Sequence, residues 1–403
     1  MALSFEAART TILESVIPLP PEAVSLLDVV GMVIAEDIRA PWDMPLWNNS
    51  AMDGFAVRAE DCVAGQTLTV NGYIPAGGSA SGITVKPGGA VKIMTGAPAP
   101  AGCDTIVPIE ETVEKNGKLI LTGQVRPGDH LRIRGEDVSK GELVIAAGTA
   151  LRPAEINMLA SFGYRTAPVF RRPKVAILST GDELVEPGED IGTGQIFNSN
   201  DYSIAAAVKQ LGGEPVLLGI ARDDRQSLTE KIKAGLQEDL LITTAGVSMG
   251  DHDLVCDVLE ALQVERRFWK VDIKPGRPTA FGLKNGKPVF SLPGNPVSSM
   301  ITFEQFVRPA LLKMMGHQRV IEPLVRAVMQ ETIKKKPGRV QFLRVRVAND
   351  GQRLVASSSG DQNTGILQTL LRANGIAVLP ANLEKLASGE EVNVQLIAAV
   401  DIV

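Results

Sequence analysis

The feature that most constrains the fold is a set of four short apolar segments between residues 174 and 302, separated by segments with helical periodicity. Strands that alternate with helical runs of ten or more residues are typical of a parallel sheet covered by helices on both faces. We therefore expect an α/β domain over residues 173–320. Its predicted strands are Lys174–Ser179, Glu214–Ile220, Asp239–Gly246 and Lys287–Gly294.

Polar and glycine-rich residues follow each of these predicted strands. In an open α/β sheet, ligands bind at the carboxyl ends of the strands. We therefore expect the chemical centre at this rim. The segments that meet there are Ser179–Glu183, Arg222–Asp224, Gly246–Asp253 and Pro293–Pro296.

The regions outside this block consist of short β-type runs broken by Gly and Pro. Regularly spaced strands with such turns predict a small inserted β domain over residues 45–142. Residues 321–403 predict a C-terminal β domain or barrel. Residues 1–44 and 143–172 are expected to form a discontinuous helical and linking domain. The expected fold class is thus multidomain, α/β plus β, around a central parallel sheet.

Four helices are expected outside or at the edge of the predicted sheet. Apolar spacing predicts the first between Ser4 and Val16, with Ser4 as the N-cap. The others are expected at Glu22–Leu27, at Pro153–Gly163, where a glycine ends the helix, and at Val297–Met315, before Gly316.

Composition excludes several classes of protein. A chain of 403 residues is too long for one ordinary core. Its net charge of -5 gives no general attraction to nucleic acid or to an acidic membrane, so an anionic ligand needs a local cluster of Lys and Arg. Three separated cysteines and three histidines argue against a disulfide framework or a structural zinc site, and favour carboxylates and Mg²⁺. The N-terminus lacks a signal-peptide core and no 18-residue apolar run occurs, so we expect a cytoplasmic protein.

Carboxylates are expected to gather on the rim. Asp182 and Glu183 follow the first predicted strand directly, and Asp223 and Asp253 follow two others. Grouped carboxylates at this place suit a hydrated Mg²⁺ bound to substrate phosphates. Each of them can instead cap a helix, and Asp253 precedes an apolar helical segment. Both interpretations stay open.

A basic set is expected on the same rim. Lys270 lies close before Lys274 and Arg277, and prolines and a glycine restrict the backbone between them. The segment up to Ser298 then supplies a helix start and a hydroxyl. Cationic side chains beside a helix start predict an anion site. No GxGxxG or GxxxxGK[ST] motif follows a strand, so a P-loop is not expected.

Three further motifs lie in the β-type regions. They are Asn48–Val57, Met94–Pro98 and Arg132–Asp137. Each by itself is typical of a turn or of a solvated loop with surface ion pairs.

Taken together, eight motifs in this order and spacing resemble one family. They are NNSAMDGFAV, KIMTGAPAP, RIRGEDV, ILSTGDEL, GVSMGDHD, KPGRPTAFG, LPGNPVS and KPGRVQFLR. The chain is similar to the MoeA family of molybdopterin molybdenumtransferases, which is related to the E domain of gephyrin. The resemblance extends from about Ala40 to Thr364.

The resemblance implies a transferase of molybdenum cofactor synthesis with a central domain of molybdopterin-binding type. Adenylylated molybdopterin is bound, molybdate is inserted and AMP is released with Mg²⁺. The family forms homodimers in which residues of the first domains face the rim of the other chain. The family's functional residues correspond to Asp53, Thr95, Asp137, Glu183, Asp223, Asp253, Lys270, Lys274, Pro293, Pro296, Arg344 and Thr364.

These correspondences suggest roles within the site. Molybdate is expected at Lys274, Arg277, Ser298 and Arg344. Mg²⁺ is expected at Asp182, Glu183 and Asp253, with Lys270 countering pyrophosphate charge. Three positions depart from the family pattern: Ala245 replaces a glycine before Gly246, Arg277 stands where lysine is common, and Asp361–Thr364 matches weakly.

Two other functions fit part of this pattern. A molybdopterin adenylyltransferase shares the α/β block, although the additional β domains and KPGRVQFLR argue against it. A non-catalytic scaffold of the gephyrin kind would not need the acidic and basic rim residues. Protein partners expected for the transferase are the adenylyltransferase and the enzymes that receive the cofactor.

Overall fold

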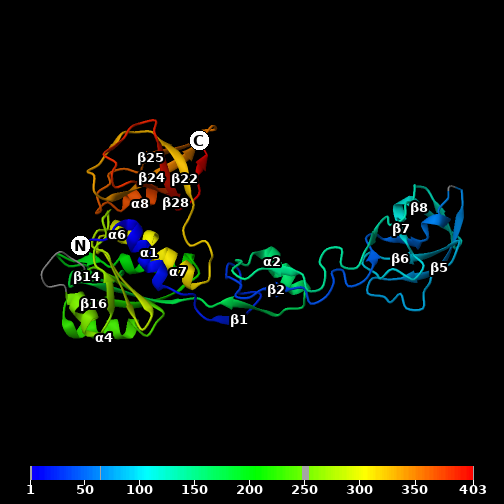
Figure 1. Cartoon of the computed structure of the whole chain (residues 1–403), viewed down its shortest axis with the longest axis horizontal. Coiled ribbons are helices and arrows are strands. Elements are labelled where there is room, and N and C mark those ends of the chain that lie inside the picture. Colours follow the sequence, from blue (N-terminus) through cyan, green and yellow to red (C-terminus); the bar gives the residue numbers. More distant parts are fainter. Residues whose placement is uncertain (1, 64, 247–253, 403) are drawn as a thin grey trace. The chain divides into compact units, whose positions relative to one another are not determined.

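The structure is a computed structural model that describes residues 2–63, 65–246 and 254–402 (Figure 1). The chain forms two compact units. The first contains residues 1–35, 148–153 and 166–403, and the second contains residues 36–147 and 154–165. The four-domain division expected from the sequence stays a prediction.

The first unit contains the predicted central sheet. Its four expected strands are present and pair in parallel, with β13 between β16 and β17 and with β21 beyond β17. Two antiparallel strands extend this sheet beyond β21. In sheet order the strands are β16 (Glu214–Ala221), β13 (Lys174–Thr180), β17 (Leu240–Thr244), β21 (Lys287–Leu292), β20 (Ala280–Lys284) and β18 (Glu265–Phe268).

Helices cover both faces of the sheet because successive residues of a buried strand point to opposite faces, and in β13 residues 175–178 are all apolar. Val175 and Ile177 of β13 pack into one core, and Ala176 and Leu178 pack into the other. The first core includes α1 (Phe5–Ser15), α3 (Asn200–Gln210), α6 (Pro296–Thr302), a π turn (Phe303–Val307) and α7 (Arg308–Met314). The second core includes α4 (Arg225–Gly235) and α5 (Leu254–Ala261).

Three of the four predicted helices are confirmed. The side chain of Ser4 accepts a hydrogen bond from the Ala7 amide and caps α1, and Gly163, at φ +76°, follows α2 (Pro153–Ser161). The helix expected at residues 22–27 is wrong. This segment is strand β1 (Pro21–Ser25), antiparallel to β12 (Thr166–Phe170). A helix of six residues is marginal by itself, so pairing with a distant strand determines its structure.

The C-terminal β domain is a closed five-stranded barrel, as the sequence predicts. Its strands follow the order β24-β25-β22-β28-β26, and β26 pairs back to β24. The bounds are β22 (Leu324–Met329), β24 (Val340–Asn349), β25 (Leu354–Ser358), β26 (Gly375–Leu379) and β28 (Glu391–Leu396). Shorter elements are β19 (Ile273–Lys274), β23 (Ile333–Lys334), β27 (Lys385–Leu386), β29 (Asp401–Ile402) and α8 (Gln368–Arg372).

The second unit confirms the inserted β region. It contains a six-stranded sheet with two apolar clusters. In sheet order the strands are β7 (Thr105–Pro108), β4 (Gly54–Val57), β6 (Gly89–Ile93), β5 (Thr67–Ile74), β9 (Lys118–Leu121) and β8 (Thr112–Lys115). Short strands outside this sheet are β2 (Ile38–Arg39), β3 (Asn49–Ser50), β10 (Leu131–Arg132) and β11 (Leu143–Ile145).

Candidate functional site

A cavity of about 440 Å³ lies at the carboxyl ends of β13, β17 and β21, and we call it the rim cavity. The carboxyl ends of parallel strands are where an open α/β sheet binds its ligands. Three residues expected from the sequence line this cavity: Glu183, Pro293 and Pro296. The other lining residues are Thr180, Leu184, Ile196–Asn200, Thr244–Gly246, Pro278, Gly294 and Asn295. Two short strands, β14 (Leu184–Val185) and β15 (Ile196–Phe197), form part of the wall.

The structure brings three of the predicted acidic residues to this region. The Asp182 carboxylate accepts a hydrogen bond of 3.2 Å from the Asp223 amide. The Glu183 carboxylate packs against Gly181, which has φ +146°, and a Cβ at Gly181 would collide with it. The positive φ favours glycine at this turn, and a larger residue would displace the Glu183 carboxylate. Asp253, the remaining acidic residue of the prediction, lies outside the described residues.

The donor set is compatible with Mg²⁺ bound mainly by substrate and water. Among residues 2–63, 65–246 and 254–402, no three His, Cys, Asp or Glu side chains are close enough to form a metal site of their own. Asp182 and Glu183 provide two adjacent carboxylates at the rim. Mg²⁺ usually keeps several waters and takes only one or two carboxylates in addition to substrate phosphates.

A buried polar network lies beneath the rim cavity. The Ser179 hydroxyl is 2.6 Å from Asp201 Oδ1, 2.7 Å from Thr244 Oγ1 and 2.9 Å from Asn198 Oδ1. Asn198 Nδ2 donates to Asp201 Oδ2 at 2.9 Å. Burial raises the pKa of Asp201 above its usual range, and the hydrogen bonds from Ser179 and Asn198 oppose this rise. The network ties β13, β17 and the start of α3 together.

Asn200 presents an unused acceptor in the wall of the rim cavity. Its Nδ2 donates to the Gly294 carbonyl at 2.8 Å. Its Oδ1 is buried and has no hydrogen-bond partner within the described part of the chain. A buried acceptor without a partner is costly, so a donor on a bound ligand would stabilise this arrangement.

The predicted basic loop packs against helix α6. Gly276 has φ +100°, and a Cβ at this position would collide with the Thr302 side chain. Lys274 is exposed, and Arg277 Nε lies 3.6 Å from Asp272 Oδ1. Ser298, in the first turn of α6, is buried. The close packing of the loop on α6 therefore fixes the backbone that carries the two cations.

Arg344 is buried in the barrel and braces the loop that follows β25. Its Nε donates to Thr369 Oγ1 at 2.8 Å, and its Nη2 donates to the carbonyls of Asp361 and Asn363. Burial lowers the pKa of Arg344, and Asp361 opposes this effect. Arg344 Nη1 is buried without a hydrogen-bond partner among the described residues. It is therefore a donor that an oxyanion could use.

The barrel loop reaches the rim of the central sheet within the first unit. Asn295 Nδ2 donates to Thr364 Oγ1 at 3.4 Å, and Asn295 lines the rim cavity. Lys274 in β19 also lies beside Gln341 of β24. These two contacts place Thr364 and Lys274, both predicted site residues, where the barrel meets the central α/β domain. Lys270 is half-buried, and its carbonyl accepts a hydrogen bond from the Leu3 amide.

The remaining predicted residues lie in the second unit. Asp53 Oδ1 accepts hydrogen bonds from the Thr95 amide at 2.7 Å and from its hydroxyl at 2.8 Å. These two bonds lower the pKa of Asp53. Asp137 is exposed, and its amide donates to the Met44 carbonyl. The structure thus joins two motifs that are 42 residues apart in the sequence.

The sequence interpretation missed Asn198, Asn200 and Asp201. A polar run before a helix is typical of a helix cap, so the sequence gives no sign that these side chains form hydrogen bonds to Ser179 and to the Gly294 carbonyl. The one available signal is that Asp201 enters a helix beside Ile204, on a face that also carries apolar residues. Its burial at 1% exposure could be found only once α3 was placed against β13.

Comparison with known proteins agrees with this architecture. Residues 3–163 match the MoeA N-terminal region (domain I and II), and residues 326–397 match the MoeA C-terminal region (domain IV). Residues 176–313 match a probable molybdopterin binding domain. The central sheet and its rim site therefore define a multidomain protein built around a domain of molybdopterin-binding type.

Relatives match nearly the whole chain. The molybdopterin molybdenumtransferase of Haemophilus influenzae is 35% identical, over 98% of this chain and 98% of that protein. Molybdopterin molybdenumtransferase 2 of Mycobacterium tuberculosis is 36% identical, over 93% of this chain and 94% of that protein. A crystal structure of the molybdopterin biosynthesis MoeA protein from Pyrococcus horikoshii has a TM-score of 0.81 at 34% identity, covering 98% of this chain and 100% of that one. The chain belongs to the MoeA family.

Proposed function

We propose that this protein is a molybdopterin molybdenumtransferase, which inserts molybdate into adenylylated molybdopterin and releases AMP. The observation that carries the proposal is the rim cavity, where Glu183 and Pro278 line one space. Pro278 directly follows Arg277 of the basic loop. The acidic residue Glu183 and the backbone of the basic loop therefore border the same space, which suits a diphosphate with its metal ion beside an oxyanion.

The acidic part of the site is assigned to Mg²⁺ and the diphosphate. Asp182 and Glu183 would hold Mg²⁺, together with Asp253. The ion supplies charge neutralisation at the phosphates. Asp223 fixes Asp182 through its amide, and Lys270 adds a positive charge near the diphosphate.

The basic part of the site is assigned to molybdate. Lys274 and Arg277 would attract the dianion, and Ser298 would donate a hydroxyl hydrogen bond. Arg344 Nη1 is a buried donor available for an oxyanion oxygen. Its other guanidinium hydrogen bonds hold the loop of Thr364 in place. Pro293 and Pro296 form part of the wall of the rim cavity.

A homodimer is part of the proposal. The family resemblance assigns Asp53, Thr95 and Asp137 to the same reaction, although they belong to a different compact unit from the rim cavity. These residues in a second copy of the chain would complete the site. The hydrogen bonds from Thr95 lower the pKa of Asp53 and so favour its carboxylate form, which suits a group that faces a metal-bound diphosphate.

The attachment of the barrel to the rim favours the transferase over the adenylyltransferase. Thr364 and Arg344 come from the barrel region, and Asn295 links the first of them to the rim cavity. An adenylyltransferase that consisted of the α/β domain alone would not need these contacts.

No helix in the described part of the chain is long and apolar enough to cross a membrane. A cytoplasmic location stays a prediction from the sequence.

A direct assay tests the proposed function. Purified protein is incubated with adenylylated molybdopterin, molybdate and Mg²⁺, and AMP release and active cofactor are measured. The Glu183→Gln variant is expected to lose cofactor formation and to keep its oligomeric state. Glu230→Gln, an exposed position on α4, is the matched control. In a parallel incubation with molybdopterin, ATP and Mg²⁺, attachment of AMP to molybdopterin would show an adenylyltransferase.

A further inference from the structure

A further cavity of about 420 Å³ lies in the first unit, at the ends of helices α3 and α7, and we call it the distal cavity. Its wall also contains residues 30–33 and Phe170. Both helical segments begin at the rim cavity, where Asn200 starts α3 and Pro296 starts α6. An α-helix rises 1.5 Å per residue, so the 11 residues of α3 separate the two cavities by about 16 Å. The distal cavity is therefore separate from the site of the proposed reaction.

Backbone contacts fix the walls of the distal cavity. The Phe170 amide donates to the Val33 carbonyl at 3.0 Å, and the His317 amide donates to the Leu312 carbonyl at 3.0 Å. Gly316, at φ +79°, lies so close to the Phe170 ring that a Cβ there would collide with it. The cavity is thus formed by the packed ends of regular elements, and ligand sites are usually pre-formed in this way.

The inner surface of the distal cavity is apolar. The side chains of Met32, Val33, Leu312 and Met315 line it and are buried. Phe170 adds a half-buried aromatic ring. Small-molecule sites usually have volumes of about 300–1,000 Å³ and a mainly apolar lining with a few polar groups, and the distal cavity fits this description.

The lining is also positively charged, although the chain as a whole has a net charge of -5. Its charged residues are Arg172, Lys209, Arg308, Arg319 and Glu322. Arg308 is paired with Glu322. Lys209 and Arg319 are exposed, and their side chains form no ion pair or hydrogen bond within residues 2–63, 65–246 and 254–402. Arg172 donates only to a backbone carbonyl, that of Asp28. Three cations at the distal cavity therefore have no carboxylate partner in the described part of the chain.

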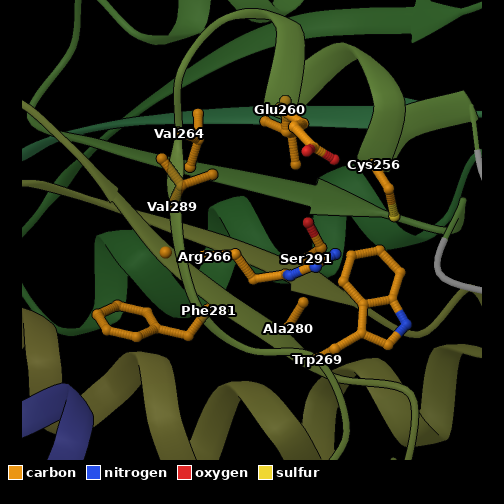
Figure 2. A pocket seen from close by; sticks show the side chains of 11 residues that line it. Cys256, Glu260, Val264, Arg266, Trp269, Ala280, Phe281, Val289 and Ser291 are labelled. Atoms are coloured by element: carbon orange, nitrogen blue, oxygen red, sulfur yellow. The ribbon is translucent and has the colours of Figure 1, made fainter.

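The cavity in Figure 2 differs from the distal cavity in this respect. It has a volume of about 210 Å³ and lies beside α5, with Arg266 and Trp269 in its lining. The Arg266 guanidinium lies 5.5 Å from the centre of the Trp269 ring. Because this cation already contacts an aromatic face, it is less available to an anionic ligand than the cations of the distal cavity.

We propose that the distal cavity binds an amphipathic organic anion, a compound that carries a carboxylate or phosphate group on an aromatic or alkyl body. The body packs against Leu312 and Met315, where it is removed from water. The anionic group lies at the mouth and accepts charge-assisted hydrogen bonds from Arg172, Lys209 and Arg319. This site goes beyond the proposed function and does not depend on it.

Titration of the full-length protein with 8-anilinonaphthalene-1-sulfonate tests the proposal. This dye joins an aromatic body to one anionic group, and its fluorescence rises in apolar surroundings. Binding should be saturable. The Lys209→Glu/Arg319→Glu variant should weaken it at least about tenfold, because two charge-assisted contacts are replaced by repulsion.

The matched control is Lys233→Glu/Lys385→Glu, which changes the net charge by the same amount. Lys233 is exposed in the last turn of α4, as Lys209 is in the last turn of α3, and Lys385 is exposed in β27. Neither control residue lines the distal cavity. The control should bind the dye as the parent does. Equal weakening in both double variants would overturn the proposal, because it would reflect only the general charge of the protein.

A further variant keeps the charges and fills the mouth. Val30 lines the distal cavity and is 59% exposed, so Val30→Phe should leave the stability in urea unchanged and weaken dye binding. Unchanged binding in Val30→Phe, with weaker binding in Lys209→Glu/Arg319→Glu, would show that the dye binds surface cations alone. That result would contradict a cavity site.

Competition against the bound dye identifies the anionic group. Benzoate or phenyl phosphate should displace the dye, and the stronger competitor shows whether the site prefers a carboxylate or a phosphate. Inorganic phosphate lacks the apolar body and should displace the dye poorly. Failure of both aromatic anions, or equal displacement by inorganic phosphate, would contradict the proposal. Molybdate and AMP should leave the dye bound, and displacement by them would place the dye in the rim cavity and overturn the proposal.

Discussion

Replacing Asp201 with alanine should destabilise the first unit because it breaks the network beneath the rim cavity. Ser179 keeps two partners in this variant, Thr244 at 2.7 Å and Asn198 Oδ1 at 2.9 Å. Asn198 Nδ2 loses its 2.9 Å bond and retains only Glu186 Oε1 at 3.4 Å. One buried donor without a good partner costs about 1–3 kcal/mol.

The Asp201→Asn variant is the matched control. Its amide oxygen can accept from Asn198, and its amide nitrogen can donate to Ser179. All buried polar groups keep a hydrogen-bond partner in this variant. Its free energy of unfolding should therefore fall by less than about 1 kcal/mol, the usual net value of a single hydrogen bond. Urea unfolding followed by Trp269 fluorescence, with Trp42 and Trp47 replaced by phenylalanine, measures the first unit. Equal stability of the two Asp201 variants would refute this reasoning.

The same pair predicts an unusual pH dependence. Burial raises the pKa of Asp201 in the folded protein, so its contribution to stability is fully present below the unfolded value of about 3.8. That contribution is lost as the pH rises through the folded pKa. Glu186 is the charged group that adds to this rise. Wild type should therefore lose stability relative to Asp201→Asn as the pH rises, and the opposite slope would contradict the assignment.

Two further substitutions test other parts of the structure. The pKa of Asp239 is lowered overall. Burial raises this pKa, but two 2.6 Å hydrogen bonds from Arg171 and one from the Lys174 amide outweigh the effect of burial. Asp239→Asn should therefore cost about 1.5–3 kcal/mol near neutral pH, and urea unfolding should show this loss shrinking as the pH falls through the folded pKa. Gly181→Ala should displace the Glu183 carboxylate and reduce cofactor formation, with circular dichroism unchanged; full activity would contradict the predicted collision.

The sequence predicted the parallel sheet and the C-terminal barrel because both rest on local periodicity. In the strand Lys174–Thr180, residues 175–178 are all apolar and buried, and Gly316 ends the last helix at the expected place. The segment at Pro21–Ser25 lacks such a local signal. Its structure depends on β12, which lies more than 140 residues away.

The site was predictable where strand ends determine position, and less so where distant segments meet. Asp182 and Asp223 follow strands of one predicted parallel sheet, so both were expected at its rim, and the structure adds a hydrogen bond between them. The position of Asp201 depends on how α3 packs, and the bracing role of Arg344 depends on the fold of the loop after β25. Neither packing arrangement leaves a periodic pattern in the sequence.

The position of bound molybdate tests the central claim most directly. Crystals soaked with molybdate, and analysed with anomalous scattering from molybdenum, would place the metal without assumptions about the protein. We predict a single strong peak within hydrogen-bonding reach of Lys274, Ser298 and Arg344, bordering the rim cavity. A molybdenum peak elsewhere on the protein, with this place empty at saturating molybdate, would contradict the assignment of the oxyanion site.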